Sequence, residues 1–224
     1  MRIVFLFDVD NTLLDTDRVT ADVRRFLSQQ ISPEEQQHYF AIFEELRAEL
    51  GYADYLGALQ RYRLAHPHHT EIMHVSLYLL NYHFAERLFP GALDVIEYVK
   101  QFGAAVILSD GDVVFQPCKI ESAGLLNAFD GNVLIFVHKE MELDAVQEKF
   151  PADHYVMVDD KLRILDAMKQ AWGARLTTVW VRQGHYAREP RHLQGYRAAD
   201  VTLEQIADLM EYDVEKLLEA TRSA

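Results

Sequence analysis

The sequence is poor in cysteine and in positive charge. Its 224 residues include a single cysteine, Cys118, so no disulfide can form within the chain and a reducing compartment is expected. Lys and Arg number 22 against 35 Asp and Glu, which gives a formal net charge of −13. This balance argues against a general binder of nucleic acid or anionic membranes, because phosphate groups repel such a surface.

Long hydrophobic runs are also missing, and no run is long enough to span a bilayer. The first run, residues 3–7, ends at Asp8, so we expect no secretory signal and a cytoplasmic protein. Half of the residues are hydrophobic, which is enough to form a sizeable core. Its length allows one or two domains.

Five short apolar runs recur along the chain, rich in β-branched or aromatic residues and with little polar alternation. They are residues 3–7, 104–108, 133–137, 155–158 and 176–181. Such runs are typical of strands buried on both faces. Segments with helical spacing lie between them, including 92–101 and 161–172, and each is followed by a glycine. The alternation predicts an α/β fold, a Rossmann-like parallel sheet with helices on both faces.

Residues 16–88 interrupt this alternation, since they contain no convincing strand. Ser32, a proline after it and Glu35 form a typical helix start, and that helix is expected to reach Gly51. Two further helices are expected over about 53–65 and 70–87. We therefore predict an α-helical cap domain at 16–88, inserted into a catalytic core formed by residues 1–15 and 89–224.

The last part of the chain gives weaker signals. Residues 182–200 are polar and irregular, Thr202 is expected to cap a helix, and a final amphipathic stretch covers about 212–222. Within the irregular part, the loop 182–191, which carries His185 and Tyr186, is interpreted as a solvated linker, with a contact to the substrate as the alternative.

Polar side chains follow four of the expected strands. They are Asp8 and Asp10, then Ser109 and Asp110, then Lys139, and finally Asp159 and Asp160. Ligands bind beyond the carboxyl ends of the strands in open parallel sheets, so we expect these side chains to meet at one edge. Crowded carboxylates repel each other unless a hard cation such as Mg²⁺, which prefers oxygen ligands, lies between them.

The order of these motifs resembles that of the haloacid-dehalogenase-like hydrolase superfamily, whose members are mostly magnesium-dependent phosphatases. The first family motif, DxDx[TV] after an apolar strand, reads DVDNT at residues 8–12. Ser109, Lys139 and the acidic pair 159–160 match the next three motifs. The segment 16–88 matches the cap of those members whose cap follows the first motif. The resemblance thus covers most of the chain.

The resemblance implies a nucleophile, an acid–base and a metal site. Asp8 would attack phosphorus and form an aspartyl-phosphate. Asp10 would protonate the leaving oxygen and then activate water, a role for which neighbouring carboxylates are expected to raise its pKa. The Mg²⁺ ligands would be the side chains of Asp8 and Asp160 and the backbone carbonyl of Asp10, with Asp159 binding directly or through water.

The resemblance also implies a phosphate site. Ser109, Lys139 and backbone amides near Asn11 and Asp110 would hold the phosphoryl oxygens. Lys119, on the helix after the second strand, is the rival to Lys139 as the phosphate-binding lysine.

Two positions depart from the family pattern. Ile164 stands where the family often has another acid, four residues after the last metal-binding aspartate, and Glu140 follows Lys139 where proline is frequent. The first departure leaves open a weaker metal site and, with it, a non-catalytic module that binds a phosphometabolite.

Two other reactions on the same fold also stay open. A phosphomutase would use the same core, whereas a haloacid dehalogenase needs no metal, and Asp10 and the Asp159–Asp160 pair argue against it. The expected partner is a small phosphorylated metabolite, with no nucleic acid or membrane, and the chain is expected to be a monomer or a homodimer.

Overall fold

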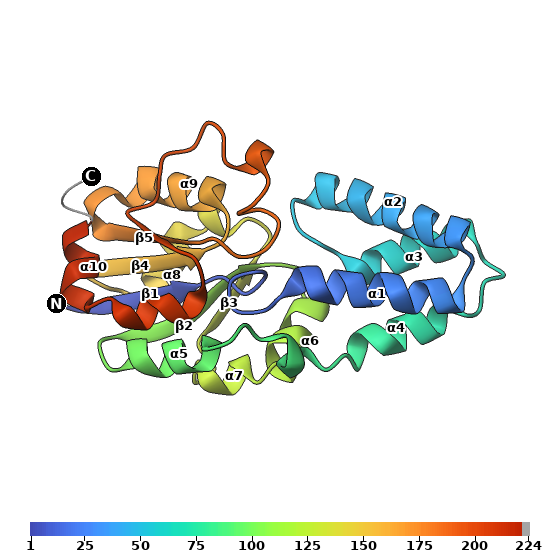
Figure 1. Cartoon of the computed structure of the whole chain (residues 1–224), viewed down its shortest axis with the longest axis horizontal. Coiled ribbons are helices and arrows are strands. Elements are labelled where there is room, and N and C mark those ends of the chain that lie inside the picture. The colour runs from blue at the N-terminus through green and yellow to red at the C-terminus, as the bar shows by residue number, and fades with distance from the viewer. Residues whose placement is uncertain (221–224) are drawn as a thin grey trace.

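The computed structural model describes residues 1–220 and contains a six-stranded sheet with helices on both faces (Figure 1). All neighbouring strands pair in parallel, in the order β3-β2-β1-β4-β5-β6. The strands are β1 (Ile3–Phe7), β2 (Ala104–Asp110), β3 (Val133–Phe136), β4 (His154–Asp159), β5 (Leu176–Val181) and β6 (Val201–Leu203). The predicted Rossmann-like α/β fold is therefore confirmed.

The sheet separates two hydrophobic cores. Along β1, Phe5 and Phe7 belong to one core and Val4 and Leu6 to the other, and all four are fully buried. Because successive side chains of a strand point to opposite faces, a strand covered on both faces needs apolar residues throughout. This explains the uninterrupted apolar run at 3–7.

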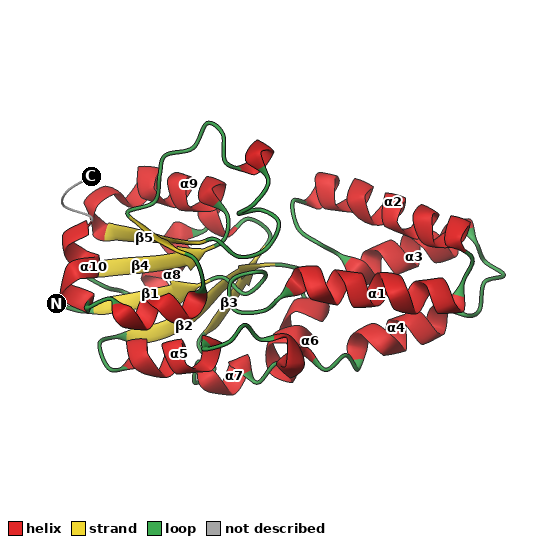
Figure 2. Ribbon diagram, in the orientation of Figure 1, coloured by secondary structure: helices red, strands yellow, loops and turns green. Residues whose placement is uncertain are grey.

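Helices cover both faces of the sheet (Figure 2). One face packs against α8 (Leu143–Lys149) and α9 (Leu162–Trp172), whose apolar residues share a core with Val4 and Leu6. The other core helices are α5 (Ala92–Lys100), α6 (Phe115–Ser122), α7 (Leu125–Ala128) and α10 (Val214–Ala220). None of the helices in the described part of the chain has both the length and the apolar character needed to cross a membrane.

The prediction for the C-terminal region was partly wrong. Thr202 caps no helix but lies in β6, where Val201 and Leu203 pair with β5. This strand has only three residues, too few to give a clear alternation in the sequence. The expected final helix corresponds to α10, and residues 221 and 222 of that expectation lie outside the described part of the chain.

Four helices fill residues 16–88, which we call the helical insert. They are α1 (Thr16–Gln30), α2 (Pro33–Leu50), α3 (Tyr55–Ala65) and α4 (Ile72–Leu80). The Ser32 hydroxyl accepts a hydrogen bond from the Glu35 amide (3.2 Å), and the Glu35 carboxylate accepts one from the Ser32 amide (3.0 Å). Gly51 ends α2 in the left-handed conformation, with φ 82°. The predicted α2 is confirmed, whereas the helix expected at 70–87 ends at Leu80.

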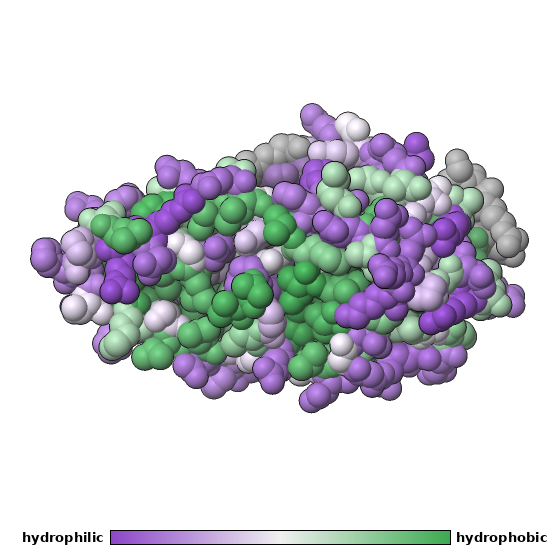
Figure 3. Space-filling model, turned by 180° about the vertical axis from the view of Figure 1, so that it is seen from behind, coloured by the Kyte–Doolittle hydropathy of each residue, from purple (hydrophilic) through white to green (hydrophobic). Residues whose placement is uncertain are grey.

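The insert leaves and rejoins the core at neighbouring points. The Asp15 amide donates to the Arg87 carbonyl (2.8 Å), and the Phe89 amide donates to the Leu13 carbonyl (2.9 Å). Leu14 lies between these bonds and forms an antiparallel bridge with Leu88. From this junction the insert extends beyond the carboxyl ends of the strands, far from both termini (Figure 1). Seen from behind the view of Figure 1, the surface of the molecule carries hydrophobic residues over its middle (Figure 3).

Candidate active site

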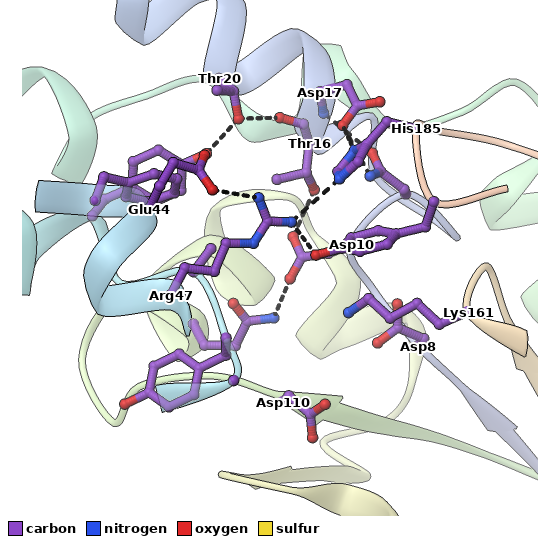
Figure 4. A pocket seen from close by; sticks show the side chains of 18 of the residues that line it. Asp8, Asp10, Thr16, Asp17, Thr20, Glu44, Arg47, Asp110, Lys161 and His185 are labelled. Atoms are coloured by element: carbon purple, nitrogen blue, oxygen red, sulfur yellow. Dashed lines mark hydrogen bonds and ion pairs between the residues drawn. The ribbon is translucent and has the colours of Figure 1, made fainter. Parts of the chain in front are cut away.

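A cavity of about 440 Å³ lies between the carboxyl ends of the strands and the helical insert (Figure 4). This volume is in the range of cavities that bind small molecules. Residues of its core wall are Asp8, Asp10, Asn11, Asp110, Gln116 and Lys161. Its insert wall, to which we assign the facing loop 182–189 as well, includes Arg24, Phe43, Arg47, Tyr52, Tyr55, His185 and Tyr186.

A tight turn after β1 keeps Asp8 and Asp10 at the end of the strand. The amides of residues 12–14 all donate to the carbonyl of Val9, at 3.3, 3.0 and 2.9 Å. Asn11 has φ 60°, a left-handed conformation that asparagine tolerates better than most residues. The motif at residues 8–12 therefore folds into a turn that presents two carboxylates to the cavity.

Lys139 lies below the cavity and joins three strand ends. Its ammonium is fully buried and contacts Asp8 Oδ1 (2.6 Å), Asp159 Oδ2 (2.7 Å) and the carbonyl of Leu108 (3.3 Å). Burial alone would lower the pKa of Lys139, but Asp159 and Asp8 outweigh it and raise the pKa. The lysine is thus a permanent cation inside the core.

Asp8, Asp159 and Asp160 form a cluster in which one oxygen of each residue lies within 4.8 Å of the others. Both carboxylate oxygens of Asp160 are buried without a hydrogen-bond partner among the described residues. Burial raises the pKa of Asp160 well above its ordinary value, and Asp159 and Asp8 add to the rise although Lys161 opposes it. Burial is also the main cause of the raised pKa of Asp8; Lys139 opposes that rise, and Asp159 adds to it.

The pKa of Asp10 differs from the raised value that was expected from the sequence. Burial raises its pKa, but the Lys119 ammonium and hydrogen bonds from Lys119, Thr16 and Gln116 outweigh burial and lower it to about 2. Asp10 Oδ1 accepts from Thr16 (2.6 Å) and Lys119 (2.5 Å), and Oδ2 accepts from Gln116 (3.0 Å). The predicted raised pKa was wrong, because the nearest charge is an ammonium on α6 rather than a carboxylate.

Only some of the predicted phosphate-binding residues line the cavity. Asn11 and Asp110 line the cavity, whereas Ser109 and Lys139 are fully buried and do not. The Ser109 hydroxyl accepts from Gln116 Nε2 (2.9 Å), and the Asp110 carboxylate accepts from the Lys139 amide (2.7 Å). Backbone amides near Asn11 were expected to bind phosphate, and the amide of Asn11 itself donates to the carbonyl of Leu14 (2.7 Å).

Lys161 also lines the cavity, although no sequence motif predicted it. It immediately precedes α9, and its amide donates to Asp159 Oδ1 (2.8 Å). Its ammonium lies 4.9 Å from the ring centre of Tyr186. Burial lowers the pKa of Lys161, but Asp8 and Asp160 outweigh it and raise the pKa, so the side chain stays charged. The position of Lys161 directly after the Asp159–Asp160 pair was the sequence feature that could have predicted its place in the cavity.

The loop expected to be a solvated linker takes part in the insert wall, so that interpretation was wrong. His185 Nδ1 lies 2.6 Å from Asp17 Oδ1, and its Nε2 lies 3.3 Å from the Arg47 guanidinium. Arg47 also donates to the Tyr186 hydroxyl. Burial raises the pKa of Asp17, but the hydrogen bond and charge of His185 outweigh it and lower the pKa. A loop after β5 thus reaches α1 and α2.

Ile164, one of the two departures from the family pattern, lies on α9. Its side chain is fully buried in the hydrophobic core formed with α9. The side chain contributes to that hydrophobic core, and it offers the acidic cluster no further oxygen.

The sequence matches the family model for haloacid dehalogenase-like hydrolases over residues 4–171. Among curated proteins, none matches the chain. Of the solved structures, a haloacid dehalogenase-like hydrolase from Burkholderia xenovorans LB400 is 57% identical, with a TM-score of 0.93, and the match covers 96% of this chain and 98% of that one.

Two more distant structures share the fold alone. A HAD (haloacid dehalogenase) phosphatase from Thermococcus onnurineus is 20% identical, with a TM-score of 0.66 and coverage of 94% of this chain and 97% of that one. The L-2-haloacid dehalogenase from Xanthobacter autotrophicus, with chloropropionic acid covalently bound, is 17% identical, with a TM-score of 0.63 and coverage of 94% and 98%. The shared fold therefore carries both reactions.

Proposed function

Because the chain belongs to the haloacid dehalogenase-like hydrolase family, we propose that it is a Mg²⁺-dependent hydrolase of small phosphate monoesters. One observation carries the choice of a metal-dependent phosphatase over a metal-free dehalogenase. The buried Asp160 carboxylate has no hydrogen-bond partner among the described residues and belongs to a cluster of three carboxylates. Such a group is costly unless a cation compensates it.

The donor set fits Mg²⁺. Asp8, Asp159 and Asp160 offer only oxygen ligands, which this hard cation prefers. These three residues, with the Asp10 carbonyl, would hold it. When bound, the cation lowers the pKa of the carboxylates that hold it and neutralises charge on a phosphate group.

In the first step, Asp8 attacks phosphorus, an aspartyl-phosphate bond forms and the ester P–O bond breaks. Lys139 fixes the Asp8 carboxylate through its Oδ1. The leaving oxygen needs a proton, and Asp10, which lines the cavity, would pass one to it from the Lys119 ammonium that is hydrogen-bonded to its Oδ1.

In the second step, water attacks phosphorus, and the aspartyl-phosphate bond breaks to give inorganic phosphate and free Asp8. Asp10 is ionised, with a pKa of about 2, and its carboxylate would orient the attacking water and take its proton as the new bond to phosphorus forms. Thr16 and Gln116 hold that carboxylate in place.

The substrate would be a small phosphorylated metabolite, since the cavity has a volume of about 440 Å³. The helical insert would act as the cap that covers it and limits the access of water. With a net charge of −13, the chain is proposed to bind neither nucleic acid nor membranes and to act in the cytoplasm.

The test is hydrolysis of an aryl phosphate with Mg²⁺ or with EDTA. We expect turnover with Mg²⁺ that EDTA removes, and a loss of roughly 10³-fold or more in Asp8→Asn, as expected when the nucleophile is removed. Asp94→Asn, an exposed aspartate on α5, is the matched control. Full turnover by Asp8→Asn would contradict the assignment of the nucleophile.

Three other outcomes would redirect the proposal. Metal-free release of chloride from 2-chloropropionate would indicate a dehalogenase. Transfer of the phosphoryl group within the substrate, seen by product analysis, would indicate a phosphomutase. Tight binding of Mg²⁺ and phosphate without turnover on a broad panel of phosphate esters would indicate a binding module.

A further inference from the structure

Three lysines lie at or behind the core wall of the cavity, and only Lys161 lines it. Lys139 is bonded to Asp8 and Asp159, and Lys119 is bonded to Asp10. These two lysines are 0% and 4% exposed. Neither ammonium is open to the cavity in this arrangement, because each already contacts a carboxylate.

Lys161 differs from both. It is half-buried and lines the cavity, and within residues 1–220 no carboxylate lies at ion-pair distance from its ammonium. Figure 4 shows its side chain extending from the turn after β4 into the cavity, beside Asp8. All of its three N–H donors are therefore available to a ligand.

Two contacts fix this position. The Lys161 amide donates to Asp159 Oδ1 (2.8 Å), which anchors the backbone to the acidic pair. The Tyr186 ring, 4.9 Å from the ammonium, contacts the side chain from the insert wall. An ammonium held in this way needs little reorganisation to meet an anion, and preorganised charge is what stabilises a phosphoryl group in transfer.

We propose that Lys161 binds the phosphoryl oxygens of the substrate directly and is the phosphate-binding lysine of this site. Lys139 then acts below the substrate by holding Asp8 and Asp159. The inference rests on the proposed phosphatase function and specifies its ligand as the dianion of a phosphate monoester. The ammonium faces charge that grows on the non-bridging oxygens while Asp8 attacks phosphorus.

The test measures binding of inorganic phosphate by calorimetry in the presence of Mg²⁺. For Lys161→Gln we expect the Kd for phosphate to rise roughly tenfold or more, because a charge-assisted hydrogen bond is lost. Lys161→Arg should restore most of the affinity, since it keeps the charge. Lys149→Gln, the same change at an exposed site on α8, should leave the Kd unchanged.

A second titration, with Mg²⁺ alone, separates phosphate binding from metal binding. We expect Lys161→Gln to bind Mg²⁺ within about threefold of the wild type, because its ammonium is no metal ligand. The inference is overturned if Lys161→Gln binds phosphate as the wild type does, or if the loss follows a matching loss of Mg²⁺. In either case the proposed function still stands if the wild type hydrolyses aryl phosphates. A wild type that neither binds phosphate nor hydrolyses esters would overturn both proposals.

Discussion

The two walls of the cavity are built differently. The core wall and the lysine directly below it gather buried charges from four strand ends, and the ion pair between Asp8 in the wall and Lys139 below it is almost wholly buried. The insert wall uses longer, partly exposed side chains, such as Arg47, whose side chain is 24% exposed. Buried charges are held in one arrangement by their partners, whereas exposed ones can change partners at small cost.

Because of this difference, the two walls are suited to two different tasks. A rigid, charged core wall suits the bond-breaking steps, which need fixed positions. An insert wall of aromatic and arginine side chains suits recognition of the rest of the substrate, because such side chains can repack around different groups. Four substitutions sharpen or break this comparison.

The largest effect is expected for Lys139→Met, which removes the buried ammonium below the core wall. Loss of the ammonium leaves Asp8 and Asp159 buried and unpaired, which should lower the free energy of unfolding by about 3–5 kcal/mol and abolish turnover. Urea unfolding in EDTA measures the stability. Lys169→Met is the control away from the cavity, since Lys169 is buried against Asp200 (2.7 Å). It should lose stability and keep Mg²⁺ binding. Unfolding of Lys139→Met at the wild-type urea concentration would show that the charges of the core wall are not coupled.

Asp160→Asn should change stability in the opposite direction. The pKa of Asp160 is raised in the folded state, so its ionisation opposes folding, and stability without metal falls as the pH rises above the ordinary value of 3.8. The neutral amide should raise the free energy of unfolding in EDTA by about 1–3 kcal/mol and weaken Mg²⁺ binding roughly 100-fold. Thermal unfolding in EDTA and in Mg²⁺ measures both. Asp144→Asn on α8 is the control, and a destabilised Asp160→Asn would contradict the view of Asp160 as an uncompensated charge.

Asp22 in the insert is also a buried carboxylate, but unlike Asp160 it has hydrogen-bond and ion-pair partners. It accepts from Tyr82 (2.5 Å) and from Arg87 (2.9 Å). Burial raises its pKa, but these partners outweigh burial and lower the pKa below the ordinary 3.8. Its contribution is thus present above pH 3.8 and is lost as the pH falls through the folded-state pKa.

Asp22→Asn should therefore cost about 1–2 kcal/mol at pH 7, and the difference from the wild type should shrink at pH 3. Urea unfolding at both pH values tests this. The comparison between the two buried carboxylates fails if Asp22→Asn is as stable as the wild type at pH 7.

The smallest effect on stability is expected for Arg47→Met in the insert wall. This change removes the contacts of α2 with His185 and Tyr186 and should cost under about 1 kcal/mol. Recognition should suffer more than chemistry, so KM should rise roughly tenfold while kcat stays within about threefold. Steady-state kinetics measures the split, with the exposed Arg18→Met as control. A fall in kcat at constant KM would place Arg47 in the chemistry instead.

The sequence predicts the core wall better than the insert wall, for a physical reason. Strand ends are local features, so the acidic motifs and the order of strands place Asp8, Lys139 and Asp160 near one another without further knowledge. What the pattern misses depends on side-chain direction. The Lys119 contact with Asp10, which lowers a pKa expected to rise, comes from a helix packing against a strand end.

The insert wall shows the same limit over a longer distance. His185 lies 168 residues after Asp17 in the chain, and only the folded loop brings the two together. β6 was missed because three residues carry too little periodicity. The start of α2 was predicted correctly because its capping box lies within one short segment, Ser32 to Glu35.

The junction of the insert has a consequence for how this architecture can be rebuilt. The backbone positions that flank residues 16–88 already form a bridged pair, with Leu14 opposite Leu88. A short hairpin turn could therefore replace all four helices without altering strand register, and a foreign domain whose ends lie close together could be grafted at the same place. The module that the sheet carries is therefore exchangeable at one place in the chain, and a replacement must supply the hydrogen bond that Thr16, within the insert, donates to Asp10.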